Sequence, residues 1–182
     1  MIYSSELALN QGSLNGFEIR SGFPDDIEAM ALLTERANAD RAGQPLPIVI
    51  PEGSEDYADL LERQDYAGFW SHLVFDGDRL AGFTAGYPGS WKGEDDGSNS
   101  DYLWLLMIDP DYQRKGIGRS LLRLAGASAY ETGASSLVLF TATDNHRAIS
   151  LYESEGYRRT GVVISDRQGE LAKYTLGICE DQ

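Results

Sequence analysis

The sequence predicts a mixed α/β fold in which helices cover both faces of one β-sheet. Segments with the two-residue periodicity of strands are interspersed with segments that repeat apolar residues at helical spacing. An almost continuous apolar run from Tyr102 to Ile108 is typical of a buried strand. A helical pattern separates this run from a second strand at 136–141, and such a crossover joins parallel strands of one sheet. We expect the element order β-α-α-β-β-β-α-β-α-β-β.

The start of the chain is polar and is expected to be separate from the folded core. Residues 1–16 are predicted to form a loose N-terminal arm or a short edge strand. Residues 17–182 are predicted to form a single domain, because a chain of 182 residues can build one sizeable core but not two. Phe17 to Arg20 alternates in polarity, which predicts the first strand.

Two helices are predicted after this strand. Pro24 is expected to begin the first helix, with acidic residues in a first turn where the helix dipole favours them. A proline-rich loop at 43–53 separates it from the second helix. Ser54 can cap that second helix, which is expected to end at Arg63.

Two further strands and a loop lead to the apolar run. Residues 69–75 and 80–87 alternate in polarity, and the Asp-Gly-Asp turn between them predicts a hairpin. Residues 88–100 are rich in Gly, Ser and acidic side chains and are predicted to be a mobile loop. The strand from Tyr102 to Ile108 is then expected to be buried on both faces.

The C-terminal part is predicted to contain two more helices. The first presents an apolar face from Ile117 onward and is expected to end at Gly133. The second covers 145–155 and is closed by Gly156. The strands expected here are 136–141, 158–165 and 171–178.

Acidic residues dominate the charge, with 29 Asp and Glu against 15 Lys and Arg and a net charge of −14. Because such a chain repels phosphate backbones, we expect no nucleic-acid partner. No apolar run approaches the roughly 18 residues of a membrane-spanning helix, and the first residues lack the features of a secretory signal. With the single cysteine Cys179, these features predict a cytoplasmic protein with no membrane association. A monomer or a homodimer without a metal site is expected, although the sequence does not specify the oligomeric state.

A basic segment that contains glycines follows the strand at 102–108 and precedes a helix. Gly116 and Gly118 allow backbone N–H groups to approach an anion closely, and the start of the helix adds partial positive charge. Three cationic side chains lie in the same segment, namely Arg114, Lys115 and Arg119. Together these features predict a binding site for a pyrophosphate.

Other interpretations of this segment were weighed. It lacks the G-x-x-x-x-G-K-[ST] spacing of a nucleotide-binding P-loop. It supplies only two of the three glycines of the dinucleotide-binding fingerprint. The glycines can also simply shape a turn while the basic side chains remain solvated.

Two motifs in the sequence resemble those of the GNAT family of N-acetyltransferases. Gln113-x-x-Gly116-x-Gly118 after a strand is similar to the family motif Q/R-x-x-G-x-G/A. Residues 145–157 are similar to its second signature, N-x-x-A-x-x-L-Y-x-x-x-G-[FY], and the element order matches the family over about 17–178. The resemblance implies acetyl-CoA as cosubstrate and the GNAT fold, a central and mostly antiparallel mixed sheet with helices on both faces.

The resemblance also implies roles for individual residues. Backbone N–H groups of the loop would hold the pyrophosphate, and the end of the preceding strand would pair with the pantetheine arm. A bulge in that strand would splay it from the strand at 136–141 and open a slot for the cofactor. The implied cofactor-binding residues are Leu106, Met107, Ile108, Gln113, Arg114, Lys115, Gly116, Ile117, Gly118, Arg119 and Asn145. The hydroxyl of Tyr152 would point at the thioester sulfur, which makes Tyr152 the implied catalytic residue.

Elementary chemistry is compatible with these roles, although each residue also has a structural interpretation. A phenol with a pKa near 10 can protonate a thiolate whose thiol has a pKa near 8.5. Strand N–H groups near Leu106 can polarise the thioester carbonyl. Tyr152 can instead be a core aromatic on the apolar face that contains Ala148, and Asn145 can cap its helix.

The general base is not apparent from the sequence. Some family members carry a glutamate in the strand before the pyrophosphate loop, whereas the matching position here is close to Trp104. Asp101 lies at the start of this strand, and His72 and His146 are candidates by residue type alone. Cys179 has no histidine nearby in the sequence, so we expect direct attack in a ternary complex and not an acyl-cysteine route.

The expected function is transfer of an acetyl group from acetyl-CoA to a primary amine, with a small-molecule acceptor preferred over a protein. Two alternatives stay open, a non-catalytic acyl-CoA-binding sensor or regulatory module and a protein lysine or N-terminal acetyltransferase. The acceptor site is expected among the loop at 43–53, the second helix and the loop at 88–100. Aromatic residues that can line this site, or equally belong to the core or loops, are Trp70, Tyr87, Trp91 and Trp104.

Overall fold

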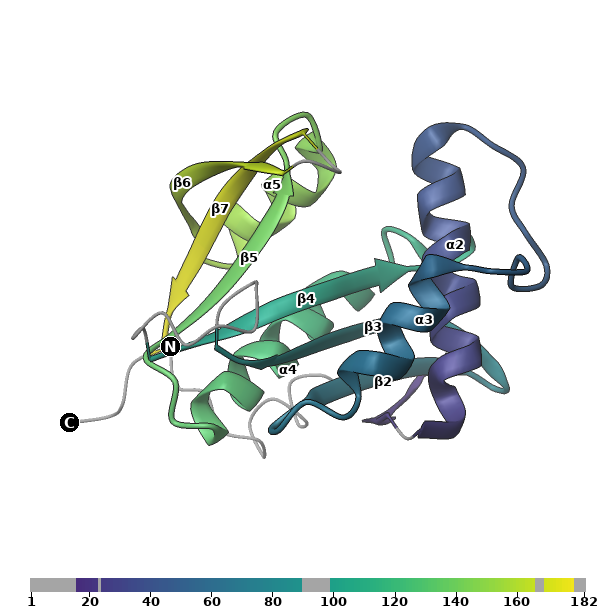
Figure 1. Ribbon diagram of the computed structural model, residues 1–182, viewed down its shortest axis with the longest axis horizontal. Helices are drawn as coiled ribbons and strands as arrows, with labels where there is room; N and C mark the ends of the chain where they lie inside the picture. Colours follow the sequence, from purple (N-terminus) through teal and green to yellow (C-terminus); the bar gives the residue numbers. More distant parts are fainter. Residues whose placement is uncertain (1–15, 23, 90–98, 166–168, 179–182) are drawn as a thin grey trace.

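The computed structural model describes residues 16–22, 24–89, 99–165 and 169–178. These residues form a seven-stranded sheet with the strand order β1-β2-β3-β4-β5-β7-β6 (Figure 1). The expected N-terminal arm, apart from Gly16, and residues 90–98 of the expected mobile loop lie outside the described residues. The strands are β1 (Glu18–Ser21), β2 (Trp70–Asp76), β3 (Arg79–Pro88), β4 (Ser100–Ile108), β5 (Ser136–Ala142), β6 (Arg158–Ser165) and β7 (Gly169–Gly177).

The sheet is mixed and mostly antiparallel, as predicted. Within the described residues the β4–β5 pair is parallel, and all other neighbouring strands pair antiparallel. The parallel pair is the one that the crossover helix connects, which confirms the strand–helix–strand unit expected from the sequence. The last hairpin, β6–β7, lies beyond β5 with β7 inserted next to it.

Helices lie on both faces of the sheet (Figure 1). One buried cluster joins α2 and α3 to the sheet through Ile27, Leu60 and Phe83, and another joins α4 to the opposite face through Ile117 and Val74. Side chains of this size contribute roughly 1.5–3 kcal/mol each when fully buried. No helix in the described part of the chain is long and apolar enough to cross a membrane. The helical segments are η1 (Pro24–Asp26), α2 (Ile27–Ala42), α3 (Glu55–Arg63), η2 (Pro110–Tyr112), α4 (Ile117–Glu131) and α5 (His146–Ser154).

Helix boundaries follow the local signals in the sequence. Pro24 begins a 3₁₀ turn that continues into α2, and Gly43 closes α2 in a left-handed conformation with φ of 67°. The hydroxyl of Ser54 accepts a hydrogen bond of 3.4 Å from the Tyr57 amide, so the predicted cap of α3 is confirmed. The predicted end of α3 at Arg63 is also confirmed.

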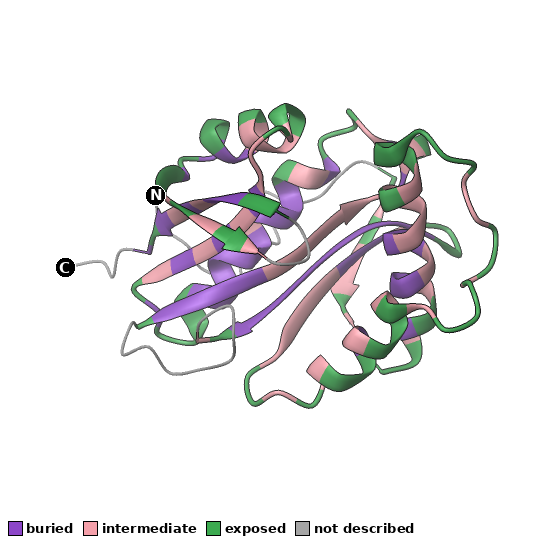
Figure 2. Ribbon diagram, turned by 45° about the horizontal axis from the view of Figure 1, so that its top comes forward, coloured by how far each residue is buried: buried purple, intermediate pink, exposed green. Residues whose placement is uncertain are grey.

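The strand predicted at 102–108 differs from expectation in two respects. It begins earlier, at Ser100, because Ser100 already pairs with Ser136 of β5. It is also not buried along its whole length: its first four residues are buried, but Trp104–Ile108 are only partly buried. Figure 2 shows this change of burial along β4, whereas β3 beside it is buried almost throughout. The reason is that β5 no longer lies beside the second half of β4.

Candidate active site

A gap opens between β4 and β5 in the middle of the sheet. The two strands pair at three positions, of which Tyr102↔Val138 is the last, and beyond it they diverge (Figure 1). On the other side of β4, Ala85 pairs with Leu105 and Gly86 pairs with Leu103, which leaves Trp104 as an extra residue. An extra residue of this kind is a β-bulge, and it bends the strand that carries it. The bulge that the family resemblance implied is therefore present.

The second half of β4 has a backbone edge that faces this gap. Leu106 and Ile108 pair with Thr84 and Gly82 of β3 on one side, but the described part of β5 pairs with neither on the other side. An unpaired strand edge offers N–H and C=O groups in the spacing that an extended ligand can match. The geometry of Leu106–Ile108 therefore suits the predicted pairing with an extended, amide-containing molecule.

The glycine-containing segment forms a loop at the end of β4 and leads into α4. Gly116 is the residue immediately before α4 and adopts a left-handed conformation with φ of 85°, which a Cβ atom would strain. The amide of Ser120 is bonded to the Gly116 carbonyl at 3.2 Å, but within the described residues no bonded carbonyl is found for the N–H groups from Gly116 to Arg119, at the start of α4. A run of unpaired N–H groups at a helix N-terminus is a site for an anion.

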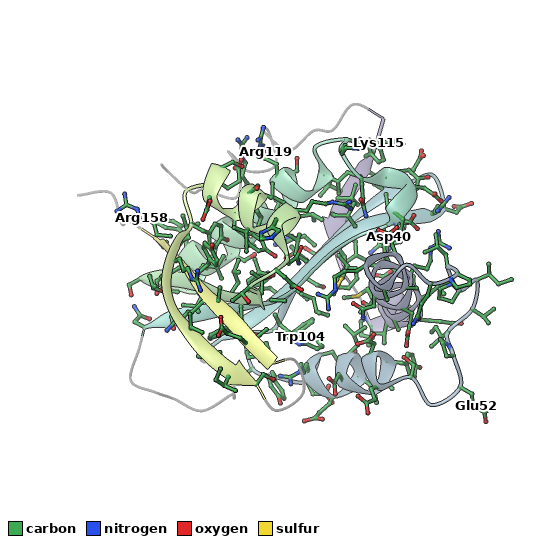
Figure 3. All side chains as sticks on the ribbon, turned by 90° about the horizontal axis from the view of Figure 1, so that it is seen from above. Asp40, Glu52, Trp104, Lys115, Arg119 and Arg158 are labelled. Carbon is green, nitrogen blue, oxygen red and sulfur yellow. The ribbon has the colours of Figure 1, made fainter. Side chains whose placement is uncertain are left out.

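Positive side chains surround this loop. Arg114 and Lys115 are exposed, and the described residues form no ion pair with either. Arg114 has φ of 63°, an uncommon left-handed conformation for a residue with a side chain. Arg119 forms an ion pair with Glu155, and Figure 3 shows Arg119 and Lys115 on the same side of the sheet. The loop thus combines unpaired amides with unneutralised cations in an acidic protein.

Gln113 and Asn145 both hold structural hydrogen bonds at this end of the molecule. The amide nitrogen of Gln113 donates to Asp40 of α2 at 3.2 Å, and its oxygen accepts from Arg147 of α5, so Gln113 bridges two helices. Asn145 accepts from the Ala148 amide at 3.4 Å, which confirms its interpretation as the cap of α5. Contact of either side chain with a cofactor stays a prediction.

Tyr152 lies on α5, on the β5 side of the gap. Its side chain is buried, and its ring lies 5.9 Å from that of Tyr157 and 6.2 Å from that of Tyr174, so the interpretation as a core aromatic is also correct. The hydroxyl has no hydrogen-bond partner among the described residues. Burial raises the pKa of Tyr152 to about 12, so the phenol is a neutral donor at any physiological pH.

Comparison with known proteins agrees with this geometry. The family model described as "Acetyltransferase (GNAT) family" matches residues 34–157, which contain the bulged strand, the glycine loop and Tyr152. The chain belongs to the GNAT acetyltransferase family. Two similar sequences are a mycothiol acetyltransferase of Geodermatophilus obscurus, 35% identical over 124 residues, and a ribosomal protein bS18 alanine N-acetyltransferase of Escherichia coli, 38% identical over 60 residues. These matches cover 64% and 33% of the chain, and they span only 39% and 40% of the relatives' own lengths.

Solved structures of other acetyltransferases share the fold. An acetyltransferase from Salmonella typhimurium, solved with its cofactor acetyl-CoA, superposes with a TM-score of 0.70 over 92% of this chain and 96% of its own, at 20% identity. The ribosomal-protein-S18-alanine N-acetyltransferase from Escherichia coli gives a TM-score of 0.67 over 91% and 96%, at 21% identity. At these identities the likeness concerns the fold alone.

Two of the candidate bases of this GNAT protein, Asp101 and His72, form hydrogen bonds away from the gap. Asp101 is buried and accepts hydrogen bonds from the Trp70 indole at 3.1 Å and the Thr132 hydroxyl at 3.0 Å, and burial raises its pKa. The Nε2 atom of His72 lies 2.7 Å from the Ser128 hydroxyl, and burial lowers its pKa to about 4. Both side chains therefore serve packing between β2, β4 and α4.

Other residues considered for the site take varied positions. His146 is exposed at the first turn of α5, and Tyr87 is almost fully buried. Trp104 is partly buried and lies beside α3, on the opposite side of the sheet from Lys115 (Figure 3). Trp91 and Cys179 lie outside the described residues. In the described part of the chain no three His, Cys, Asp or Glu side chains are grouped to hold a metal ion.

Two charged groups that support the site were missed by sequence analysis. Asp109, directly after β4, is buried and accepts hydrogen bonds from Arg36 of α2 and Arg79 of β3 at 3.0 to 3.4 Å. Glu155 after α5 pairs with Arg119 and with a second arginine of α4. The partners of Asp109 are 73 and 30 residues away in the sequence, so only its position between a strand and Pro110 signalled a structural role.

Proposed function

We propose that this GNAT protein transfers an acetyl group from acetyl-CoA to a primary amine of an acceptor, by direct attack in a ternary complex. The observation that carries the proposal is the gap between β4 and β5. Within the described residues it combines an unpaired strand edge, unpaired amides at the start of α4 from Gly116 to Arg119, and the Tyr152 hydroxyl without a partner. These three features match the amide-containing arm, the pyrophosphate and the thioester sulfur of acetyl-CoA.

Each part of the cosubstrate has a group to receive it. The amides of the loop from Arg114 to Arg119, with the start of α4, would hold the pyrophosphate, and Arg114 and Lys115 would neutralise part of its charge. The edge of Leu106–Ile108 would pair with the pantetheine arm in the manner of an added strand. Asn145 would contact the same arm from the start of α5.

The proposed reaction forms a C–N bond and breaks a C–S bond. An N–H group of β4 next to the bulge would polarise the thioester carbonyl while the neutral amine attacks its carbon. Tyr152 would donate its proton to the departing sulfur and recover one from solvent, and the proton that the amine loses passes to solvent. Burial that raises the pKa of the phenol also raises the pKa of a thiol beside it. The difference between the two pKa values therefore changes less than either value alone.

The acceptor is proposed to be a small molecule, and the reaction is proposed to take place in the cytoplasm, as the single cysteine suggests. We also propose that residues 17–182 form a single domain, that the protein is a monomer or a homodimer, and that it uses no metal ion. The second candidate is acetylation of a protein N-terminus, which the similarity to a ribosomal protein bS18 alanine N-acetyltransferase favours. A binding module without catalysis is less well supported, because it gives no role to the unpartnered hydroxyl of Tyr152.

Calorimetric titration with acetyl-CoA tests the proposal first. We expect micromolar binding that weakens strongly in the double variant Arg114→Met, Lys115→Met and is unchanged in Arg158→Met, which removes an exposed arginine of β6 (Figure 3). Amine-dependent release of the free thiol is then measured with a panel of primary amines. Binding without thiol release for any amine or peptide would favour the sensor, and absence of binding would remove the proposal.

A further inference from the structure

Arg63, at the end of α3, has its guanidinium surrounded by aromatic rings. Its Cζ atom lies 4.7 Å from the ring centroid of Trp104, 5.6 Å from that of Tyr66 and 5.7 Å from that of Tyr87. Its Nη1 atom also donates a hydrogen bond of 2.8 Å to the Tyr87 hydroxyl. Aromatic faces attract a cation and restrict its movement, so the guanidinium is held in place before any ligand binds.

This cluster lies where β4 and β5 separate. Trp104 is the bulged residue, and Tyr102 is the last residue of β4 that pairs with β5. The rings of Tyr102 and Tyr87 lie 5.5 Å apart, so the aromatic cluster extends to this point on the α3 face of the sheet. Tyr152 belongs to the same buried cluster as Leu103, which follows Tyr102 in β4 and therefore projects from the opposite face.

The charge of Arg63 is not neutralised within the described residues. Five other arginines form ion pairs with carboxylates, namely Arg20, Arg36, Arg79, Arg119 and Arg123. Arg63 forms none with a described residue, although the chain contains 29 acidic residues, and its one recorded hydrogen bond uses one of the five N–H donors of a guanidinium. A fixed guanidinium with unused donors is well suited to bind a carboxylate through two parallel hydrogen bonds.

A second cation lies on the same face of the sheet. Lys173 of β7 pairs in register with Phe140 of β5, so the two side chains project from the same face. The ring of Phe140 lies 5.9 Å from that of Tyr102, which connects this position to the aromatic cluster. Lys173 is partly buried and forms no ion pair with a described residue. Lys173 therefore adds positive charge to the face of the sheet that carries the aromatic cluster.

We propose that Arg63 binds a carboxylate of the acceptor, so that the acceptor is an amine whose own molecule carries a carboxylate, as a free amino acid does. This inference rests on the proposed acetyltransferase function and names the class of its acceptor. The carboxylate would be held against Trp104 and Tyr87, which places the amine toward the bulge of β4. A protein lysine or a peptide N-terminus has a neutral amide at the matching position and would leave the guanidinium unpaired.

The competing explanation is that Arg63 only fastens α3 to the sheet. In that case its removal lowers stability but leaves the choice of acceptor unchanged. The two explanations predict different values for one ratio, kcat/KM for an amino acid divided by kcat/KM for the primary amide of the same amino acid. A general loss of folded protein lowers both values equally and does not alter this ratio.

The test measures thiol release from acetyl-CoA with the common amino acids as free acids and as primary amides. We expect the best free acid to exceed its amide by about 10- to 100-fold in kcat/KM, mainly through KM, as is usual for a charge-assisted hydrogen bond. Arg63→Met should bring this ratio close to one, Arg63→Lys should restore part of it, and Arg158→Met should leave it unchanged. Calorimetry should show the same affinity for acetyl-CoA in all these variants.

The possible outcomes distinguish failure of the carboxylate inference from failure of the proposed acetyltransferase function. If amides or peptides react as well as free acids, or if Arg63→Met keeps the wild-type ratio while it binds acetyl-CoA normally, the carboxylate inference is wrong and the acetyltransferase function stands. If wild-type protein releases no thiol with any amine, the proposed function itself fails. A thermal melt of each variant confirms that the compared samples are folded.

Discussion

Glu155, which follows α5, forms an ion pair of 2.6 Å with Arg119 in the first turn of α4. The carboxylate is 6% exposed, and its second oxygen accepts a hydrogen bond of 3.0 Å from Arg123. This contact connects the helix that begins at the glycine loop to the helix that carries Tyr152. The proposed pyrophosphate site and the proposed proton donor are therefore held together by one carboxylate.

Replacement of this carboxylate should loosen the connection. Glu155→Gln leaves two arginines without a partner, but both are partly exposed, so we expect a loss of about 1–2 kcal/mol in the free energy of unfolding. For a chain of this size that loss lowers the melting temperature by about 3–6 °C. Thermal melts check the value, with Glu131→Gln at the exposed end of α4 as the matched control. Equal melting temperatures for both variants would show that the pair adds nothing to stability.

Removal of the Tyr152 hydroxyl should affect catalysis and not binding. Tyr152→Phe keeps the buried ring and deletes a hydroxyl that no described residue binds, so stability should change little. A proton donor typically contributes about 10²- to 10⁴-fold to a rate, and we expect a loss in kcat within this range. Steady-state thiol release measures kcat, and calorimetry should give an unchanged affinity for acetyl-CoA. Tyr130→Phe, at an exposed position of α4, is the control, and wild-type kcat in Tyr152→Phe would exclude the phenol as donor.

The same substitution should change the stability of the protein at alkaline pH. Burial raises the pKa of Tyr152 from 10.0 to about 12, so the folded state holds the proton more tightly than the unfolded state. The resulting stability is complete below pH 10 and is lost as the pH rises from 10 toward 12. The difference in free energy of unfolding between wild type and Tyr152→Phe should therefore change by about 1–2 kcal/mol between pH 9 and pH 11. Denaturant unfolding at a series of pH values measures it, and a constant difference would contradict the raised pKa.

Arg114 allows the charge of the loop to be separated from its backbone strain. Because its φ is 63°, Arg114→Gly removes a left-handed strain that costs about 1 kcal/mol, and stability should stay equal or rise by up to that amount. The affinity for acetyl-CoA should nevertheless fall by about three- to tenfold, as expected when one charged contact is lost. Arg114→Met removes the charge but keeps the strain, so it should lose affinity without gaining stability. Unchanged binding in both variants would show that Arg114 does not contact the pyrophosphate.

The sequence was informative where structure depends on local signals. The cap at Ser54, the left-handed Gly43, the strand–helix–strand crossover and the helix at Gly116 all follow from residues close together in the chain. The pairing of Arg63 with Trp104 could not be inferred in this way, because it requires α3 to lie across β4. The partial burial of Trp104–Ile108 was also missed, since an apolar run looks the same whether protein or another molecule covers it.

Long-range ion pairs are the part of the site that sequence alone could not supply, and Asp109 permits a direct test of one. Burial acts to raise its pKa, but hydrogen bonds from Arg36, the Asp111 amide and Arg79 outweigh burial and hold the pKa below its usual value of 3.8. Asp109 therefore contributes stability above pH 4, and this contribution is lost as the pH falls through the lowered pKa. The same carboxylate caps η2, which leads into the glycine loop.

Asp109→Asn should accordingly destabilise the protein near neutral pH and weaken cofactor binding. Loss of a buried charge that pairs with two arginines should lower the free energy of unfolding by about 2–4 kcal/mol at pH 7. As the pH falls from 4 through the lowered pKa of Asp109, first the unfolded and then the folded carboxyl group takes up a proton, so the difference in free energy of unfolding between the two proteins should narrow. Urea unfolding between pH 3 and pH 7 measures this difference, with Asp25→Asn at an exposed position as the control. A difference in free energy of unfolding that stays constant over this range would mean that Asp109 acts through its shape and hydrogen bonds, and not through its charge.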